Sequence, residues 1–246
     1  MILEERAYIK MKFSKRMDLF GESIFTTLAN MRSERKKQGL EVIDLSIGAP
    51  NIPPTQEVME TIAKEAMKPE NYLYAIQDAV DLQNTVKEWY ERRYGVVIDP
   101  TTELTSLLGS QDGLAHLALT LVDEGDTVLV QDPCYPIFRD GPLLAGAKVV
   151  TMPLLKENDY LIDFDEINEK TAQDAKYMIV SYPNNPTCGV ANDEFYKKLI
   201  VFAKKYNIMI LHDNAYSELL FEGPGHSFLE FEGAKDVGIE FNSLSK

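Results

Sequence analysis

The sequence predicts an α/β protein in which a mostly parallel sheet carries helices on both faces. From Glu103 onward, short apolar runs alternate with helical segments, which is the pattern of βαβ units. Polar residues follow each run at the point where a parallel strand would end. Of the 246 residues, 45% are hydrophobic and 26% are charged, which is the composition of a globular protein that can bury a sizeable core.

The first part of the chain predicts helices and one strand-like run. Residues 1–40 carry apolar side chains at helical spacing, and Gly39 is placed to end that helix. Val42 to Ser46 resembles a strand. The turn from Gly48 to Pro54 either lines a pocket, since its glycine allows close backbone approach, or simply connects strand to helix. Two further helices are expected at Thr55 to Met67 and at Asp78 to Arg93, the second closed by Gly95.

The second part of the chain predicts the sheet. The candidate strands are Leu104 to Leu108, Thr127 to Gln131, Lys148 to Met152, Tyr177 to Ser181, Ile208 to His212 and Val237 to Asn242. In open α/β sheets ligands bind at the carboxyl ends of the strands, so we expect the functional residues there.

Charge and cysteine content exclude several classes of protein. The net charge of -14 opposes general binding to nucleic acid or to an anionic membrane, and no run reaches the length of a membrane helix. Cys134 and Cys188 are too few for a disulfide framework, so a reducing cytoplasm is the expected compartment. No HExxH or CxxC spacing indicates a metal site.

Two motifs at the expected strand ends could hold a flat phosphorylated ligand. The segment Gly109-Ser-Gln-Asp-Gly113 opens a helix expected over Leu114 to Val122, where backbone amides and the Ser110 hydroxyl can receive a phosphate. A simple helix cap explains it equally well. In Asp132-Pro-Cys-Tyr-Pro136, two prolines restrain Tyr135, which can stack on a ring or pack beneath the next helix.

Three further features concern polar and charged groups near the end of the chain. The turn Tyr182-Pro-Asn-Asn-Pro-Thr187 fixes two side-chain amides that can donate to an oxygen. Asp213 ends an apolar strand, and a buried carboxylate needs a cation or several donors, which a bound pyridinium would supply. Lys246 follows another apolar run, and it is either a lysine held out of water, which can attack a carbonyl carbon, or a solvated lysine at a chain end.

Taken together, the motifs GSQDG, DPCYP, PNNPT, HDNAY and SLSK occur in the order and with the gaps of one family. From Gly21 to Lys246 the chain resembles the fold type I pyridoxal-phosphate-dependent aminotransferases of class I/II. The resemblance implies pyridoxal 5'-phosphate as the cofactor, and it implies transfer of the α-amino group of an L-amino acid to a 2-oxo acid. It also implies a role in amino-acid metabolism and biosynthesis.

The resemblance assigns roles residue by residue. Lys246 is similar to the family's Schiff-base lysine, Asp213 to the partner of the pyridine nitrogen, and Asn185 and Tyr216 to the donors to the phenolic oxygen. Ser110, Gln111 and Ser243 are similar to the residues that bind the cofactor phosphate, and Tyr135 to the ring that stacks on the cofactor. Gly48 lies in the turn that faces the substrate carboxylate, which Asn185 also faces. Tyr74 is similar to a tyrosine that reaches the phosphate bound by a neighbouring subunit.

The chain departs from the family pattern in one motif and at its C-terminal end. Cys188 stands where the family has the glycine of NPTG. The family continues past its lysine with a return strand and a small domain, so we expect a chain truncated at Lys246 and a sheet incomplete at its C-terminus. Residues 1–47 would then belong to the small domain and 48–246 to the cofactor-binding domain, in a homodimer. The alternatives are a carbon-sulfur lyase of the same fold and an inactive cofactor-binding or dimerising fragment.

Overall fold

The computed structural model describes residues 11–48 and 50–246, and the chain divides into two compact units, Met1–Ile47 and Gly48–Lys246. In the first unit, the 3-10 helix η1 (Lys15–Leu19) precedes α1 (Ile24–Lys37), and Gly39 follows with a φ of 75°. The sequence therefore located this helix and its stop correctly.

The strand expected at Val42 to Ser46 is wrong, because residues 41–45 have no regular structure. Ile43 and Leu45 are 84% and 89% exposed, so neither face of this segment is buried against a neighbour within its unit. Arg32 pairs instead with Asp44 and holds the segment beside α1. An extended segment without a hydrogen-bonding partner does not become a strand.

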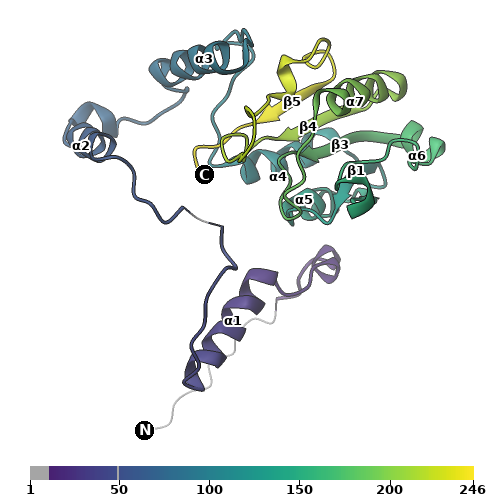
Figure 1. The fold of residues 1–246 in the computed structure, drawn as a ribbon, viewed down its shortest axis with the longest axis horizontal. Coiled ribbons are helices and arrows are strands. Elements are labelled where there is room, and N and C mark those ends of the chain that lie inside the picture. The colour runs from purple at the N-terminus through teal and green to yellow at the C-terminus, as the bar shows by residue number, and fades with distance from the viewer. Residues whose placement is uncertain (1–10, 49) are drawn as a thin grey trace. The chain divides into compact units, whose positions relative to one another are not determined.

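The second unit is built on a five-stranded sheet with the order β2-β1-β3-β4-β5, in which every neighbouring pair is parallel (Figure 1). The parallel sheet that the sequence predicts is thus confirmed. The strands are β1 (Thr127–Asp132), β2 (Lys148–Pro153), β3 (Ala175–Ser181), β4 (Met209–Asp213) and β5 (Gly238–Phe241). The helices are α2 (Gln56–Glu65), α3 (Val80–Tyr94), α4 (Ser110–Leu121), α5 (Ile137–Ala145), α6 (Glu169–Asp174) and α7 (Asp193–Tyr206), with short 3-10 turns η2 (Pro69–Tyr72), η3 (Lys156–Asn158) and η4 (Phe228–Glu230).

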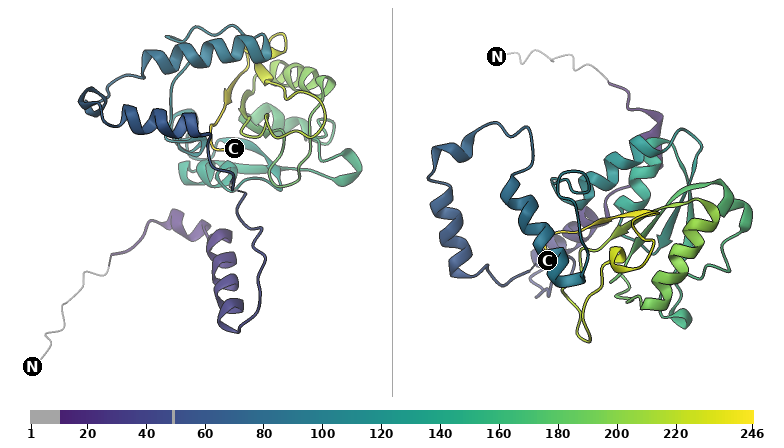
Figure 2. Two further views of the ribbon diagram at one scale, coloured as in Figure 1. Left: turned by 60° about the vertical axis from the view of Figure 1, so that its left-hand side comes forward. Right: turned by 90° about the horizontal axis from the view of Figure 1, so that it is seen from above.

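Each face of the sheet has its own core because successive side chains of a strand point to opposite faces. On one face, Met178 and Ile210 pack against α7, and on the other, Ile179 and Leu211 pack with α4 and α5. Figure 2 shows α7 on the opposite side of the sheet from α4 and α5. The central strand β3 is buried along almost its whole length because both of its faces are covered.

Helix α3 lies beside β5 and ends at Gly95, which takes a left-handed φ of 67° as a C-cap. Tyr90 and Tyr94 are its buried residues, and both form contacts with the segments around β5. Helix α2, by contrast, buries none of its residues. The expected helices over Thr55 to Met67 and Asp78 to Arg93 are therefore present with slightly shifted ends.

The strand expected at Leu104 to Leu108 is absent. Leu108 is 96% exposed, and Ser106 is held by the Asp78 carboxylate, which accepts from its backbone N–H at 2.8 Å and from its hydroxyl. The sheet ends at β5 on this side, so this segment has no neighbouring strand among the described residues. The apolar residues of this segment are typical of a strand, but the local sequence does not show whether a neighbouring strand is present to pair with it.

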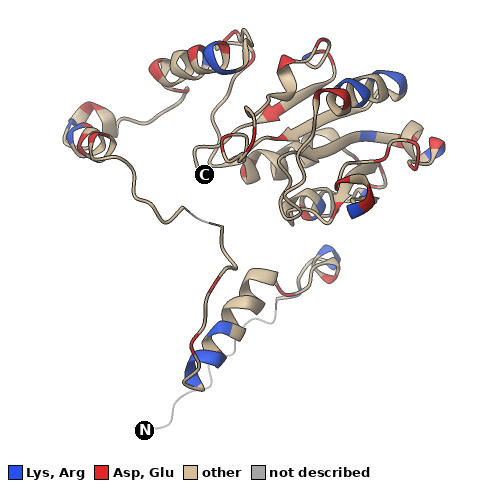
Figure 3. Cartoon of the chain, in the orientation of Figure 1, with Lys and Arg blue, Asp and Glu red and all other residues tan. Residues whose placement is uncertain are grey.

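Two surface properties complete the fold. In the described ranges 11–48 and 50–246, no helix is long and apolar enough to cross a membrane. Figure 3 shows acidic and basic residues on the same helices, including α3 and α7, in a chain whose net charge is -14. Neither of these helices is therefore lined by basic residues alone.

Candidate active site

The residues that the sequence assigns to the site follow the carboxyl ends of parallel strands. Tyr135 comes after β1, Asn185 after β3, Asp213 at the end of β4, and Ser243 after β5. Helix α4 begins at Ser110, on the face of the sheet toward which Asp213 points, since Asp213 is two residues from Leu211 on the same strand. The topology alone thus gathers residues that are far apart in sequence along one edge.

Asp213 is the most informative group of this edge. The residue is 5% exposed, and its Oδ1 atom is buried without a hydrogen-bond partner among the described residues. Burial raises the pKa of Asp213 from 3.8 to about 6, although the nearby His212 and the N–H of Ala215 lower it in part. A buried carboxylate in this condition requires a cationic donor, so the position fits the protonated nitrogen of a pyridine ring.

Asn185, Tyr216 and Lys246 are joined by contacts with one another. The Asn185 amide donates from Nδ2 to the Tyr216 hydroxyl at 3.3 Å, and the Lys246 ammonium lies 5.3 Å from the centre of the Tyr216 ring. Lys246 Nζ also donates to the Gly48 carbonyl oxygen at 2.9 Å. The turn at Gly48 and the end of the chain at Lys246, which the sequence assigns to one site, are therefore in contact.

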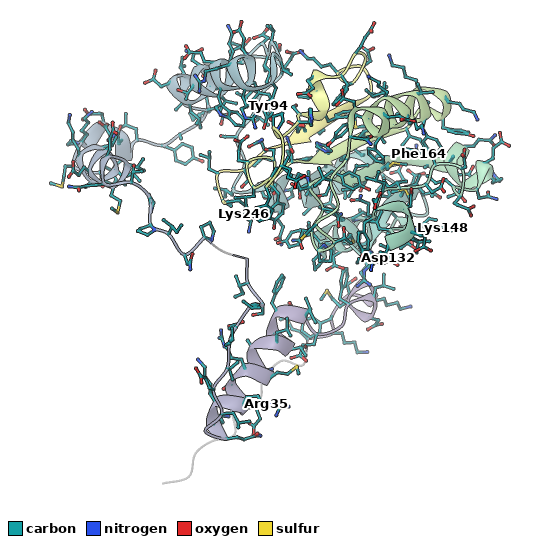
Figure 4. The ribbon with its side chains drawn as sticks, in the orientation of Figure 1. Arg35, Tyr94, Asp132, Lys148, Phe164 and Lys246 are labelled. Atoms are coloured by element: carbon teal, nitrogen blue, oxygen red, sulfur yellow. The ribbon has the colours of Figure 1, made fainter. Side chains whose placement is uncertain are left out.

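One expectation about Lys246 is wrong, because its side chain is exposed rather than held out of water. The residue lies five positions beyond Phe241, the last residue of β5, and is outside the core that covers the sheet. Figure 4 shows Lys246 at this edge of the unit, with Tyr94 on α3. Of the run before the lysine, Phe241 is buried and Ile239 is 38% exposed, so the burial of the strand is incomplete and does not extend to Lys246.

The amino end of α4 provides the anion-binding geometry. Gly109 is its N-cap with a φ of 93°, and no side chain caps the first turn. The free backbone N–H groups at this end favour a phosphate. The Gln111 side chain accepts from the Tyr135 hydroxyl at 2.8 Å, so the ring is tied to the first turn of α4, and burial raises the pKa of Tyr135.

The helix begins at Ser110 rather than at Leu114 as the sequence predicted. Gly113 lies within it because the helix packs closely on the sheet: a Cβ atom there would come within 2.7 Å of the Phe241 ring. Glycine at this position thus reflects close packing as well as the turn that the sequence indicated.

Ser243 and Tyr74 are less closely joined to the site. The Ser243 hydroxyl donates to the Ser245 hydroxyl at 2.8 Å and accepts from the Ser245 N–H at 3.1 Å, within a turn after β5. Tyr74 is 92% exposed, so its ring is not packed within its own chain. Its assignment depends on a neighbouring subunit.

The turn that carries Tyr216 is held from three sides. The Tyr94 hydroxyl donates to the Ser217 hydroxyl at 3.0 Å, and the Asn214 amide donates to the His226 carbonyl oxygen at 3.1 Å. Gly225 touches the same turn so closely that a Cβ atom there would lie 1.9 Å from the Ser217 carbonyl oxygen. These contacts fix the backbone on which the Tyr216 ring is mounted.

Behind Asp213, on the opposite face of the sheet, lies a buried carboxylate that the sequence did not reveal. We call its surroundings the Glu240 cluster, which consists of Glu240, His212, Tyr90, Ser227 and Phe228. The Glu240 Oε1 atom accepts from the Tyr90 hydroxyl at 2.8 Å and from the Ser227 hydroxyl at 2.9 Å. Its Oε2 atom accepts from the Phe228 N–H at 2.7 Å and contacts His212 Nδ1 at 3.0 Å.

The two asparagines of the PNNPT turn have different surroundings. Asn185 contacts Tyr216, whereas Asn184 is 3% exposed and is hydrogen-bonded within the turn and to Gln131. The residues alone left both amides as possible donors, and the family resemblance selected Asn185. Among the described residues, no group of three or more histidine, cysteine, aspartate or glutamate side chains could hold a metal ion.

The parallel five-stranded sheet with helices on both faces is the α/β fold of the pyridoxal-phosphate-dependent aminotransferases of fold type I. The family described as aminotransferase class I and II matches residues 41–246. The chain belongs to this family, whose members depend on pyridoxal 5'-phosphate.

Individual relatives agree. The LL-diaminopimelate aminotransferase of Aquifex aeolicus is 43% identical over 238 residues, which are 96% of this chain and 61% of the relative. Among solved structures, BacF from Bacillus subtilis in its apo form has a TM-score of 0.89 and 36% identity, over 96% of this chain and 61% of its own. The probable N-succinyldiaminopimelate aminotransferase of Thermus thermophilus has a TM-score of 0.85 and 33% identity, over 91% of this chain and 60% of its own. The chain thus spans about three fifths of the length of these relatives.

Proposed function

We propose that this chain forms the cofactor-binding part of a pyridoxal-phosphate-dependent aminotransferase that moves the α-amino group of an L-amino acid to a 2-oxo acid. The observation that carries the proposal is the buried carboxylate of Asp213, whose Oδ1 atom has no hydrogen-bond partner among the described residues, on the strand-end edge that also carries Asn185, Tyr216 and Lys246. Family membership and the relatives named above support it. Residues 48–246 would be the cofactor-binding domain, and residues 1–47 would be part of a smaller domain.

In this proposal the edge of the sheet holds the cofactor by its charged groups. Asp213 accepts a hydrogen bond from the pyridine nitrogen and keeps it protonated. Asn185 and Tyr216 donate to the phenolic oxygen. The phosphate lies at the amino end of α4, against Ser110 and the Gln111 N–H, with Ser243 as a further donor, and the Tyr135 ring stacks on the pyridine.

When bound, pyridoxal phosphate supplies an aldehyde that takes up the amino group and a ring that accepts the electrons left at the α-carbon. The remaining chemistry is proton transfer by this chain. Lys246 would act as the base that takes the proton from the α-carbon and as the acid that returns it to the C4' atom. Gly48, whose carbonyl contacts Lys246, places the substrate carboxylate at the same side.

The names of the relatives favour a substrate that carries a second amino acid group, of the LL-diaminopimelate kind, and a place in amino-acid biosynthesis. The test is transamination by the protein in its full natural length, with LL-diaminopimelate and 2-oxoglutarate. We expect glutamate as a product. Release of pyruvate and ammonia from a thioether amino acid, without a new amino acid, would refute the proposal in favour of a lyase.

The cofactor assignment is tested separately with Lys246→Ala. Borohydride treatment of the wild-type protein should attach the cofactor covalently to Lys246, as peptide mapping would show, and the variant should lack this attachment. Lys204→Ala is a matched control, because Lys204 is exposed and pairs with Asp236 at 2.9 Å, away from the strand ends. Attachment that survives in Lys246→Ala would refute the assignment.

We further propose a homodimer in a reducing cytoplasm. Tyr74 is 92% exposed, and α2 leaves Val58, Met59 and Ile62 exposed, so a second copy would cover apolar surface while bringing Tyr74 to its phosphate. Both Cys134 and Cys188 are free thiols. Sedimentation of the full-length protein should give a two-chain mass, and a monomer that binds the cofactor tightly would contradict the proposal.

A further inference from the structure

Two buried side-chain amides connect the strands on either side of the candidate site. Gln131, on β1, is fully buried, and Asn184, in the turn after β3, is 3% exposed. The Gln131 Oε1 atom accepts from the Ser181 backbone N–H at 2.8 Å and from the Asn184 amide at 3.2 Å. Because both partners are N–H donors, the oxygen of Gln131 must face them, which fixes the orientation of its amide.

Asn184 in turn holds together the tight turn that follows β3. Its Oδ1 atom accepts from the Thr187 N–H at 3.1 Å and from the Thr187 hydroxyl at 2.8 Å. Its backbone N–H donates to the Gly189 carbonyl at 2.8 Å, and its carbonyl accepts from the Cys188 N–H at 2.8 Å. Every polar atom of Asn184 is thus engaged in shaping the turn that contains Asn185.

Asn185 is the part of this turn that faces the site. Its Nδ2 atom lies 3.3 Å from the Tyr216 hydroxyl, with which it would share the phenolic oxygen of the cofactor. Gln131 also immediately precedes the segment from Asp132 to Tyr135. Its side chain therefore connects the backbone that carries the Tyr135 ring to the turn that carries Asn185. The strands β1 and β3 are neighbours in the sheet, which keeps this bridge short.

We propose that Gln131 and Asn184 are positioning residues that set the direction of the Asn185 amide toward the cofactor, through a chain of buried hydrogen bonds that begins on β1. This inference rests on the proposed function, in which Asn185 donates to the phenolic oxygen. Without the Gln131 oxygen, the Ser181 N–H loses its buried side-chain acceptor, and the Asn184 amide keeps only the Ser181 carbonyl oxygen at 3.3 Å, so the turn relaxes away from the geometry that Asn185 requires.

The experiment compares Asn184→Ala and Gln131→Met with the wild-type protein in its full natural length. Met keeps the length of the Gln131 side chain but removes the acceptor. The readouts are the dissociation constant for pyridoxal phosphate, from fluorescence titration, and the pH midpoint of the absorbance change of the bound cofactor. A weakened donor to the phenolic oxygen should raise this midpoint and should raise the dissociation constant about tenfold.

Asn192→Ala is the matched control. Asn192 also accepts a backbone N–H through its side chain, from Phe195 at 3.0 Å, but it caps α7 rather than the site turn. It should lower the melting temperature, as loss of a helix cap does, and leave the midpoint and the affinity unchanged.

The outcomes separate the inference from the function on which it rests. A wild-type protein that does not bind pyridoxal phosphate would overturn the proposed function. Wild-type binding, with an unchanged midpoint and affinity in Gln131→Met, would overturn the positioning role alone. A raised midpoint in that variant, with the Asn192→Ala values unchanged, supports the role even if Asn184→Ala fails to fold.

Discussion

Removal of the Glu240 carboxylate should cost this protein a large part of its stability. The side chains of Glu240 and His212 are both fully buried, and the carboxylate accepts from the hydroxyls of Tyr90 and Ser227 and from the Phe228 N–H. Since a carboxylate only accepts, His212 Nδ1 donates the remaining bond. Burial, together with the charge of Glu240, raises the pKa of Tyr90 well above its ordinary value, so the tyrosine stays a donor.

In Glu240→Ala all of these buried donors lose their acceptor at once. Each unsatisfied buried group costs about 1 to 3 kcal/mol, but the losses are not additive because water can enter the space. Loss of one member of a buried charged network typically costs about 3 to 5 kcal/mol, and we expect this amount. That is about a fifth or more of the roughly 5 to 15 kcal/mol that stabilises an ordinary domain.

The assay is urea unfolding of the full-length protein at pH 7, followed by circular dichroism. Glu240→Gln should fall between the wild type and Glu240→Ala, because one oxygen remains as an acceptor. Glu194→Gln is the control: Glu194 pairs with Lys198 on the exposed face of α7, and the midpoint should not move. A Glu240→Ala midpoint equal to that of the control would refute the reasoning, because it would mean that the donors find water without loss.

Three further predictions concern the site. Because burial raises the pKa of Asp213 from 3.8 to about 6, the native protein without cofactor binds this proton more tightly than the unfolded chain does. The free energy of unfolding should therefore fall by about 3 kcal/mol as pH rises from about 4 to 6. Denaturation curves of Asp213→Asn should lack this fall. Cys188 has a left-handed φ of 61°, so Cys188→Gly should raise the free energy of unfolding by about 0.5 to 1 kcal/mol, and a loss would contradict this account of the turn. Gly225→Ala should displace the Ser217 carbonyl and with it the Tyr216 turn, raising the dissociation constant for pyridoxal phosphate several-fold; unchanged binding would show that the turn does not depend on this contact.

The sequence predicted those features that depend on local pattern. Apolar runs and their polar ends located the strands and Asp213, and the glycine after α3 located its end. The segment at Leu104 to Leu108 has the same local pattern but lacks a neighbour in the sheet, and pattern alone cannot supply one. Gln131 was missed for a related reason: a polar residue within an apolar strand shows that a partner exists, but it does not show where that partner lies.

Side chains alternate between the two faces of the sheet along β4 and β5, so the buried carboxylates of Asp213 and Glu240 lie on opposite faces. Register pairs His212 with Glu240 and Asp213 with Phe241, so the first pair faces α7 and the second faces α4 and α5. A slip of β4 by one residue would exchange these faces, turning the His212 imidazole toward the proposed cofactor site and Asp213 into the opposite core. The hydrogen bonds that satisfy Glu240 and His212 therefore favour the register in which Asp213 faces the proposed site.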